Sequence, residues 1–260
     1  MGSTMTDEIV TAAFLIIFLG SAAAALYARR QGRATLGLGI HDAMAGDIVA
    51  GIVIGALGVG GTIAVILATG AAHIDDVGLD LPQLGLGAAV FAGAALLEEV
   101  VYRSLMLTGL MVLTGRPAVA LGASAAVFGI VHLTGSPDAT AISVTSNALG
   151  GLMYGIAFLR TRRIWLPLGI HFSWNFVQAS LLGFPTSGNT TYSGAVTHVT
   201  IGSPHWLSGG GYGPEGSVVS LLFRLAVIAM VLTVTRRAVP AGGPTLGTPP
   251  PAAGHSNLGR

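Results

Sequence analysis

The sequence predicts an all-α fold, a polytopic transmembrane helix bundle of seven to eight spans around a polar intramembrane cavity. The first observation is composition, because 52% of the residues are hydrophobic and only 9% are charged. Soluble domains usually carry about a quarter of charged residues. The second observation is a series of long apolar stretches, and the third is a small set of ionisable residues inside them.

Apolar stretches of roughly 20 residues, the length that crosses a bilayer, recur along the chain. We predict spans at about 8–27, 48–72, 84–113, 118–135, 141–159, 164–182 and 217–235. The polar stretch 183–216 is rich in Gly, Ser and Thr and is interpreted as a loop, with a substrate lid, an eighth span or a re-entrant segment as alternatives. The tail 239–260 is rich in Pro and Gly and is predicted to be disordered, which leaves 1–238 as the transmembrane domain.

Charges in the connecting loops predict the orientation of the chain. Every second loop is basic, with Arg29, Arg30, Arg33, Arg116, Arg160, Arg162, Arg163, Arg236 and Arg237, whereas the alternate loops carry Asp or no charge. This positive-inside pattern predicts an N-terminus outside and a C-terminus in the cytoplasm. The lack of Lys suggests a GC-rich genome and hence a bacterial plasma membrane. A net charge of +1 gives no indication of a nucleic-acid partner, so membrane lipids are the expected surroundings.

The stretch LLEEVVYRSL, from Leu96 to Leu105, places three ionisable groups inside an apolar span. A carboxylate there is costly and usually marks function. Glu99 and Arg103 are spaced i,i+4 and can neutralise one another on a helix. Glu98 is left unpaired and points about 100° away around the helix. The pattern favours Glu98 as the functional carboxylate and the Glu99–Arg103 pair as a structural one.

Further polar residues lie in two other predicted spans. His132 follows Phe128 by one turn in VFGIVHL, and His171 precedes Asn175 by one turn in HFSWN. A desolvated Glu with a neighbouring His can activate water, and a second His and an amide can stabilise an oxyanion. With no Cys in the chain and no obvious Ser or Thr nucleophile, hydrolysis by activated water is the expected chemistry. Zn²⁺ is an alternative, although HExxH spacing is missing.

Helix rise gives conflicting depths for these residues. Counted from the arginines, Glu98 lies about 27 Å and His132 about 24 Å along their helices, but His171 only about 12 Å and Asn175 about 18 Å. Arg224, in the last span, has no evident role, and we expect it to pair with a carboxylate or a lipid headgroup or to lie nearer the interface. The glycine clusters GALGVGG (55–61) and GGLMYG (150–155) predict close helix packing.

Three motifs in this order resemble a known family over about 96–178, within a core at about 84–182. EEVVYR (98–103), FGIVH (128–132) and HFSWN (171–175) are similar to the motifs of the CPBP (CAAX protease and bacteriocin-processing) intramembrane proteases, also called Abi or type II CAAX prenyl endopeptidases. The resemblance implies about eight helical spans around a water-filled cavity open to the membrane and the cytosol.

The resemblance also implies roles for the motif residues. Glu98 would activate water together with His132, and His171 and Asn175 would stabilise the oxyanion. Glu99 and Arg103 would be supporting positions, as would the motif residue Phe128. The family is described both as a metalloprotease and as a metal-free glutamate protease. A metal, if one is bound, would be held by Glu98, His132 and His171.

The predicted function is an intramembrane endopeptidase that cleaves a membrane-associated peptide or protein at or near the cytoplasmic side. One alternative is a non-proteolytic enzyme on the same scaffold that acts on a lipid-like or small substrate. Another is a proton-coupled transporter, because buried acids and histidines also relay protons. The sequence shows no pair of broken helices in corresponding halves, which argues against transport.

Overall fold

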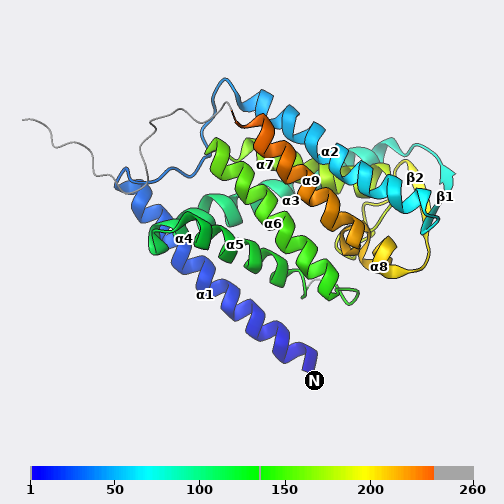
Figure 1. Cartoon of the computed structure of the whole chain (residues 1–260), viewed down its shortest axis with the longest axis horizontal. Coiled ribbons are helices and arrows are strands. Elements are labelled where there is room, and N and C mark those ends of the chain that lie inside the picture. Colours follow the sequence, from blue (N-terminus) through cyan, green and yellow to red (C-terminus); the bar gives the residue numbers. More distant parts are fainter. Residues whose placement is uncertain (1, 135, 237–260) are drawn as a thin grey trace, which may run out of the picture.

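The computed structural model describes residues 2–134 and 136–236, and most of them are helical (Figure 1). The helices are α1 (Gly2–Arg30), α2 (Met44–Ala68), α3 (Leu81–Glu99), α4 (Thr108–Thr114), α5 (Pro117–Val131), α6 (Ala141–Thr161), α7 (Trp165–Phe176), α8 (His205–Ser208) and α9 (Val218–Val234). Two π-helical segments, η1 (Val100–Leu107) and η2 (Val177–Leu181), continue α3 and α7, and two 3₁₀ turns, η3 (Gly210–Tyr212) and η4 (Pro214–Gly216), precede α9. The tail 239–260, which was predicted to be disordered, lies outside the described residues.

Each of the seven apolar stretches folds as helix, but their lengths differ. Four helices are long and apolar enough to cross a membrane by length and composition, namely Glu8–Arg30, Met44–Ala68, Leu81–Thr114 and Ala141–Thr161. The apolar helices Pro117–Val131 and Val218–Val234 are shorter. The four long helices fit an integral membrane protein, whereas the number of seven to eight spans stays a prediction.

Large apolar side chains cover much of the outer surface of the bundle. Leu19, Leu57, Leu97 and Leu222 are each 60–66% exposed, and they lie on α1, α2, α3 and α9. A protein in water rarely exposes so much apolar surface, whereas lipid tails solvate it without cost. The buried core lies inside the bundle, around Trp174, Tyr154, Met106 and Phe128.

A small β-sheet departs from the all-α prediction. Strand β1 (Ala72–Val77) pairs antiparallel with β2 (Thr197–Ile201), which lies in the stretch interpreted as a loop. The two strands are rich in β-branched residues, which suit a pleated surface, but the acidic pair of β1 had been assigned to a loop. Helix α2 correspondingly ends at Ala68, four residues before the predicted end of its span. The sheet ties the stretch 183–216 to the bundle.

Helices α2 and α7 pack closely because glycines line their contact. A Cβ atom on Gly51 would lie 2.9 Å from the Cα atom of Gly169, and one on Gly169 would lie 3.0 Å from that of Gly51. Gly55 faces the backbone of Ile170 in the same way. In lipid the hydrophobic effect does not drive helices together, and small residues allow the close backbone contact that stabilises their packing instead. This contact fixes α7, which carries two of the motif residues.

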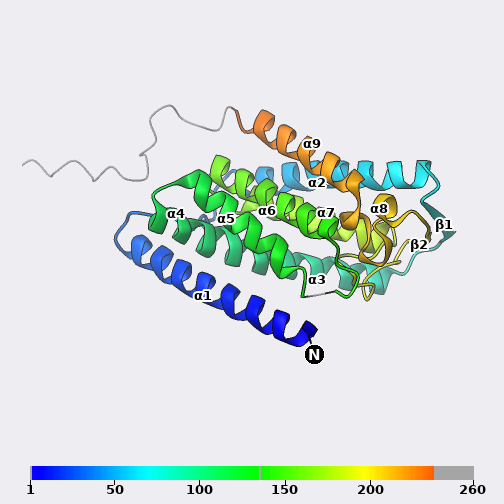
Figure 2. The same ribbon diagram turned by 60° about the horizontal axis from the view of Figure 1, so that its bottom comes forward.

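The two ends of the bundle differ in charge. The ends of α1, α4, α6 and α9 lie at one end, and β1, β2 and α8 lie at the other (Figure 2). The first end carries eight arginines, Arg29, Arg30, Arg33, Arg116, Arg160, Arg162, Arg163 and Arg236. At the opposite end the described residues include Asp75, Asp76, Asp80 and Asp138 and no arginine. We call these the arginine end and the sheet end.

We expect Gly55→Ala to lower the free energy of unfolding by about 1–3 kcal/mol, as overpacking does. The added methyl group would lie 2.5 Å from the carbonyl oxygen of Ile170 and force α2 away from α7. Gly60→Ala in the same helix is the matched control, because a Cβ atom there meets nothing within 4 Å. Thermal unfolding in detergent measures both variants, and equal midpoints would contradict the close contact.

Candidate active site

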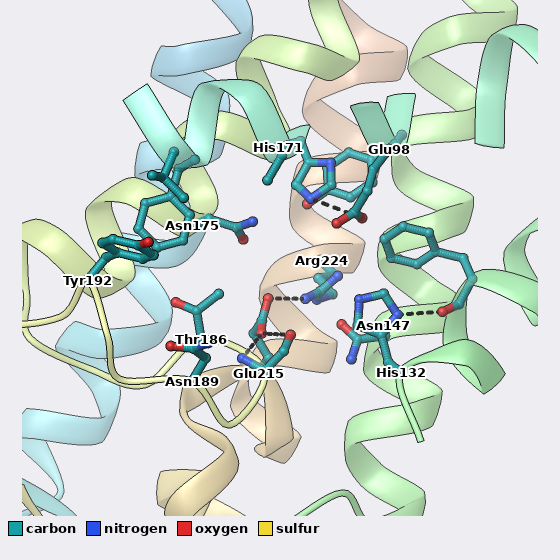
Figure 3. Close-up of a pocket in the computed structure, with 16 residues that line it drawn as sticks. Glu98, His132, Asn147, His171, Asn175, Thr186, Asn189, Tyr192, Glu215 and Arg224 are labelled. Carbon is teal, nitrogen blue, oxygen red and sulfur yellow. Dashed lines mark hydrogen bonds and ion pairs between the residues drawn. The ribbon is translucent and has the colours of Figure 1, made fainter. Parts of the chain in front are cut away.

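A cavity of about 220 Å³ lies inside the bundle and is shown in Figure 3. It brings together all four residues proposed from the sequence as catalytic, Glu98 from α3, His132 from the C-cap of α5, and His171 and Asn175 from α7. The other lining residues come from α3, α5, α6, the stretch 183–216 and α9: Val90, Phe91, Ala94, Phe128, Asn147, Tyr154, Thr186, Ser187, Asn189, Tyr192, Glu215 and Arg224.

The two adjacent glutamates have different surroundings. Glu98 lines the cavity and its side chain is 32% exposed, whereas that of Glu99 is fully buried. The Nε atom of Arg103 lies 3.3 Å from the Oε2 atom of Glu99, so the predicted i,i+4 ion pair is present. A step of one residue turns the side chain by about 100° around a helix. Of the two, Glu98 is therefore the carboxylate that reaches the cavity.

Arg103 is held by aromatic rings as well as by Glu99. Its guanidinium carbon lies 4.8 Å from the ring centroid of Phe128, 5.0 Å from that of Tyr154 and 5.7 Å from that of Tyr102. Its Nη2 atom donates to the carbonyl oxygen of Gly151. Cation–π contacts strengthen when the cation is desolvated. These contacts keep a buried cation beside the Glu99 carboxylate.

His171 bridges the two glutamates. Its Nδ1 atom lies 2.9 Å from the Oε1 atom of Glu99, and its Nε2 atom lies 3.8 Å from the Oε2 atom of Glu98. An ionised carboxylate only accepts hydrogen bonds, so Nδ1–H donates to Glu99. In the neutral imidazole Nε2 is then the acceptor that faces Glu98. The ring also stacks on Tyr154, with centroids 4.5 Å apart and planes 15° apart.

His132 is fixed in the same tautomer by another contact. Its Nδ1 atom lies 2.6 Å from the carbonyl oxygen of Phe128, which can only accept, so Nδ1–H donates. The Phe128 ring packs on the imidazole with centroids 4.6 Å apart. Nε2 is left as an acceptor. Within the described residues no hydrogen bond joins His132 to Glu98, and the two lie on different sides of the cavity (Figure 3).

The length of the α3 run explains the large depth counted for Glu98. Helix α3, η1 and α4 form one run from Leu81 to Thr114, which is 34 residues long. Because roughly 20 residues cross a bilayer, counting from the end of this run overstates the depth of Glu98. The run extends past the level of the cavity toward the arginine end. Two of the three motifs adjoin a π-helical segment, because η1 begins within EEVVYR, directly after Glu99, and η2 begins directly after Phe176.

A second polar cluster forms the wall opposite Glu98. Glu215 accepts hydrogen bonds from the backbone N–H and the hydroxyl group of Ser187, at 3.0 and 2.9 Å. Its Oε1 atom lies 3.4 Å from the Nη2 atom of Arg224, whose guanidinium carbon lies 4.7 Å from the ring centroid of Trp174. Arg224 is 1% exposed. It therefore pairs with a carboxylate, which was one of the alternatives drawn from its position in the sequence.

The stretch 183–216 is a folded cap rather than a plain loop. Besides β2 and α8, it supplies Thr186, Ser187, Asn189, Tyr192 and Glu215 to the cavity. Its η3 turn receives a hydrogen bond of 2.6 Å from the Nδ2 atom of Asn147 to the hydroxyl oxygen of Tyr212. Burial raises the pKa of Tyr212 to about 12, so that phenol stays neutral. Neither an eighth span nor a re-entrant helix occurs in it, because its described helices are short.

Sequence reasoning missed the cap residues and Asn147. One usable signal was Arg224, a cation inside an apolar run nine residues after Glu215. Another was the seven-residue spacing of Asn147 and Tyr154, which puts both on one helix face. The residues Thr186, Ser187 and Asn189 carry no such signal, because their turn-rich stretch shows no periodicity.

Comparison with known families matches a segment of the chain. Residues 80–177 match the family model described as type II CAAX prenyl endopeptidase Rce1-like, and this segment contains Glu98, His132, His171 and Asn175. The match confirms the resemblance to type II CAAX prenyl endopeptidases and supports a CAAX-type intramembrane protease in general. Neither a curated protein nor a solved structure matches the chain.

A metal site was the alternative interpretation of Glu98, His132 and His171. Within the described residues, no group of three or more His, Asp and Glu is arranged to hold a metal ion. Glu98 and His171 are neighbours, but His132 does not complete a ligand set with them. In this structure the three residues do not fit Zn²⁺.

We expect Arg224→Met to lower the free energy of unfolding by about 3–5 kcal/mol, because it leaves Glu215 as an uncompensated buried charge. The double variant Glu215→Gln/Arg224→Met removes both charges and should lose less than Arg224→Met alone. Arg163→Met breaks the partly exposed Asp47–Arg163 pair and should cost about 1 kcal/mol or less. Chemical denaturation in detergent measures all three, and strict additivity would contradict the pairing.

Proposed function

We propose that this protein is an intramembrane endopeptidase that hydrolyses a peptide bond in a membrane-associated peptide or protein through water activated by Glu98. The observation that supports the proposal best is the half-buried Glu98 carboxylate, which lines the cavity beside His171 within the Rce1-like segment. A buried carboxylate with access to water and a neighbouring imidazole is the arrangement that general-base hydrolysis needs.

Hydrolysis on these groups begins with water between Glu98 and the scissile carbonyl carbon. Glu98 takes one proton as the water oxygen forms the new C–O bond, and the carbonyl electron pair moves to oxygen. The Asn175 amide donates a hydrogen bond to this oxyanion. When the tetrahedral intermediate collapses, the C–N bond breaks and the proton held by Glu98 passes to the leaving nitrogen.

The histidines take part in this proton transfer. The Nε2 atom of His171 faces Glu98 and can share its proton, after which the imidazolium donates to the oxyanion. The Nδ1 contact with Glu99 stabilises that imidazolium, as a buried carboxylate does in a Ser-His-Asp triad. The Nε2 atom of His132 is free to accept from the attacking water on the other side of the cavity. Glu99, Arg103 and Phe128 position these rings.

The setting of the reaction is also proposed. We place the protein in a bacterial plasma membrane as a bundle of seven to eight spans, with its N-terminus outside, its C-terminus in the cytoplasm, and lipids around its apolar surface. The support is the arginine end, because cytoplasmic loops carry the excess of Arg.

We expect Glu98→Gln to lower kcat/KM for cleavage by about 10²–10⁴-fold, the usual contribution of a general base. The amide keeps the shape of the side chain but cannot take a proton. Glu8→Gln is the matched control, because Glu8 is exposed on α1 and far from the motif helices in sequence. The assay is fluorogenic cleavage of peptides and prenylated peptides by purified protein in detergent.

Equal cleavage by the wild type, Glu98→Gln and His132→Ala would contradict the proposed reaction. Proton flux in liposomes that Glu98→Gln abolishes, without any peptide cleavage, would favour a transporter. Turnover of a lipid-like substrate without peptide cleavage would favour the non-proteolytic enzyme.

We expect cleavage to persist after incubation with 1,10-phenanthroline and removal of the chelator. The reason is the donor set, because His132 does not join Glu98 and His171 as a third ligand. The measurement is activity beside metal content by mass spectrometry. Loss of activity that one equivalent of Zn²⁺ restores would overturn the metal-free reaction and establish the zinc alternative.

A further inference from the structure

We infer that the arginine end binds an anionic phospholipid at the contact between α1 and α4, with the lipid phosphate held by Arg29, Arg30 and Arg116. We call these three residues the arginine cluster. The inference goes beyond the proposed reaction and does not depend on it. It also goes beyond lipid as the solvent of the apolar surface, because it assigns a charged headgroup to one place on the bundle.

Close packing of α1 against α4 brings the arginine cluster together. Gly109 lies directly against the backbone of Ser21, where an added Cβ atom would overlap the carbonyl oxygen. From this contact both helices run toward the arginine end, where they finish side by side (Figures 1 and 2). Arg29 and Arg30 follow Ser21 by eight and nine residues. Arg116 follows Gly109 by seven, so all three arginines lie about two turns beyond the contact.

Helical phase places Arg29 on the face of α1 that packs on its neighbours. Ala22 and Ala25 on this face are buried, and Arg29 follows them by seven and four residues. Arg30 flanks the same face, about 100° further around the helix. Arg116 is exposed as the N-cap residue of α5, just after α4 ends. The arginine cluster therefore lies around the contact of α1 with α4 and not on separate sides of the bundle.

No carboxylate in the described part of the chain pairs with the arginine cluster, although all three residues are exposed. Two other arginines of the same end differ, because Arg163 pairs with Asp47 and Arg160 donates to Thr235. A guanidinium binds a phosphate group through two parallel N–H groups, which makes Arg the favoured residue for such anions. The arginine cluster thus offers several unpaired guanidinium groups to one phosphate.

Exposed leucines beside the arginine cluster match the acyl chains of the same lipid. Leu26 lies three residues before Arg29 and is 44% exposed. Leu113 lies three residues before Arg116 and is 61% exposed. A soluble phosphate would contact the arginines and leave the leucines uncovered. A phospholipid covers both, because its apolar chains run from the phosphate toward the middle of the membrane.

The loop 31–43, directly after α1, indicates that the arginine end lies at the depth of the headgroups. The indole N–H of Trp165 donates to the carbonyl oxygen of Gly39 at 2.9 Å, which ties the loop to the start of α7. The next residue, Ile40, is 83% exposed. Aromatic and apolar side chains beside arginines are typical of the membrane interface. Basic sites between helices at this depth on the cytoplasmic side bind anionic headgroups.

Native mass spectrometry of the full chain in detergent measures which lipids stay bound. Phosphatidylglycerol is the anionic probe, and phosphatidylcholine with the same acyl chains is the zwitterionic control. We expect the wild type to retain about tenfold more phosphatidylglycerol than phosphatidylcholine, since each arginine near the surface favours an anionic lipid about fivefold. Arg29→Gln/Arg116→Gln should retain the two lipids about equally. Equal retention by the wild type would overturn the inference.

Arg162→Gln/Arg236→Gln is the matched control. It also removes two exposed arginines from the arginine end, but these follow α6 and α9, and α9 lies across the bundle from α1 (Figure 2). This variant should keep the preference of the wild type. The same loss in both double variants would overturn the site, because the preference would then come from the total charge of that end.

Glycerol 3-phosphate, which carries the charge without acyl chains, distinguishes a lipid from a soluble phosphate. At equal concentration it should leave the bound phosphatidylglycerol in place. Displacement would overturn the lipid in favour of a soluble phosphate compound. Both double variants should unfold at the temperature of the wild type in phosphatidylcholine, which separates lost binding from lost folding. None of these measurements involves peptide cleavage, so failure of the proposed reaction would leave their results unchanged.

Discussion

The buried carboxylate of Glu99 is the interaction on which the rest of the site depends. It forms an ion pair with Arg103 on one side and accepts a hydrogen bond from His171 on the other, and it thereby joins α3 to α7. A charge removed from water is costly unless it is paired and hydrogen-bonded, so both partners have to stay in place. Their positions in turn set the aromatic contacts of Arg103 and the direction of His171 Nε2. Glu98 remains the one glutamate of the pair that can meet water.

The helical architecture and the motif residues could largely be predicted from the sequence. Apolar length marks helices in lipid, and charges inside such helices are too costly to be accidental. The division between Glu98 and Glu99 followed from the i,i+4 spacing of Glu99 and Arg103 and from the helical angle. The roles of the histidines were harder, because the Glu99–His171 contact joins residues 72 positions apart. Helical phase places a residue on a face but does not say which helix it meets.

The cap shows where prediction failed and why. Residues 183–216 have few long apolar side chains and no periodicity, so their order comes from contacts with other elements. Glu215 binds Ser187, Asn147 binds Tyr212, and β2 pairs with β1, and each partner is distant in sequence. The predicted end of the span that contains α2 was wrong for a related reason. Hydropathy does not change where α2 gives way to the turn before β1.

The pairing of β1 with β2 has a consequence for the kind of substrate that could enter the cavity. The cap is held by this sheet and by the Gln83 side chain, which donates to the carbonyl oxygen of Ser193. The cap is therefore tied to its neighbours at two points, at β1 after α2 and at Gln83 on α3. For the proposed peptidase, a rim held in this way would favour extended peptide chains over folded domains.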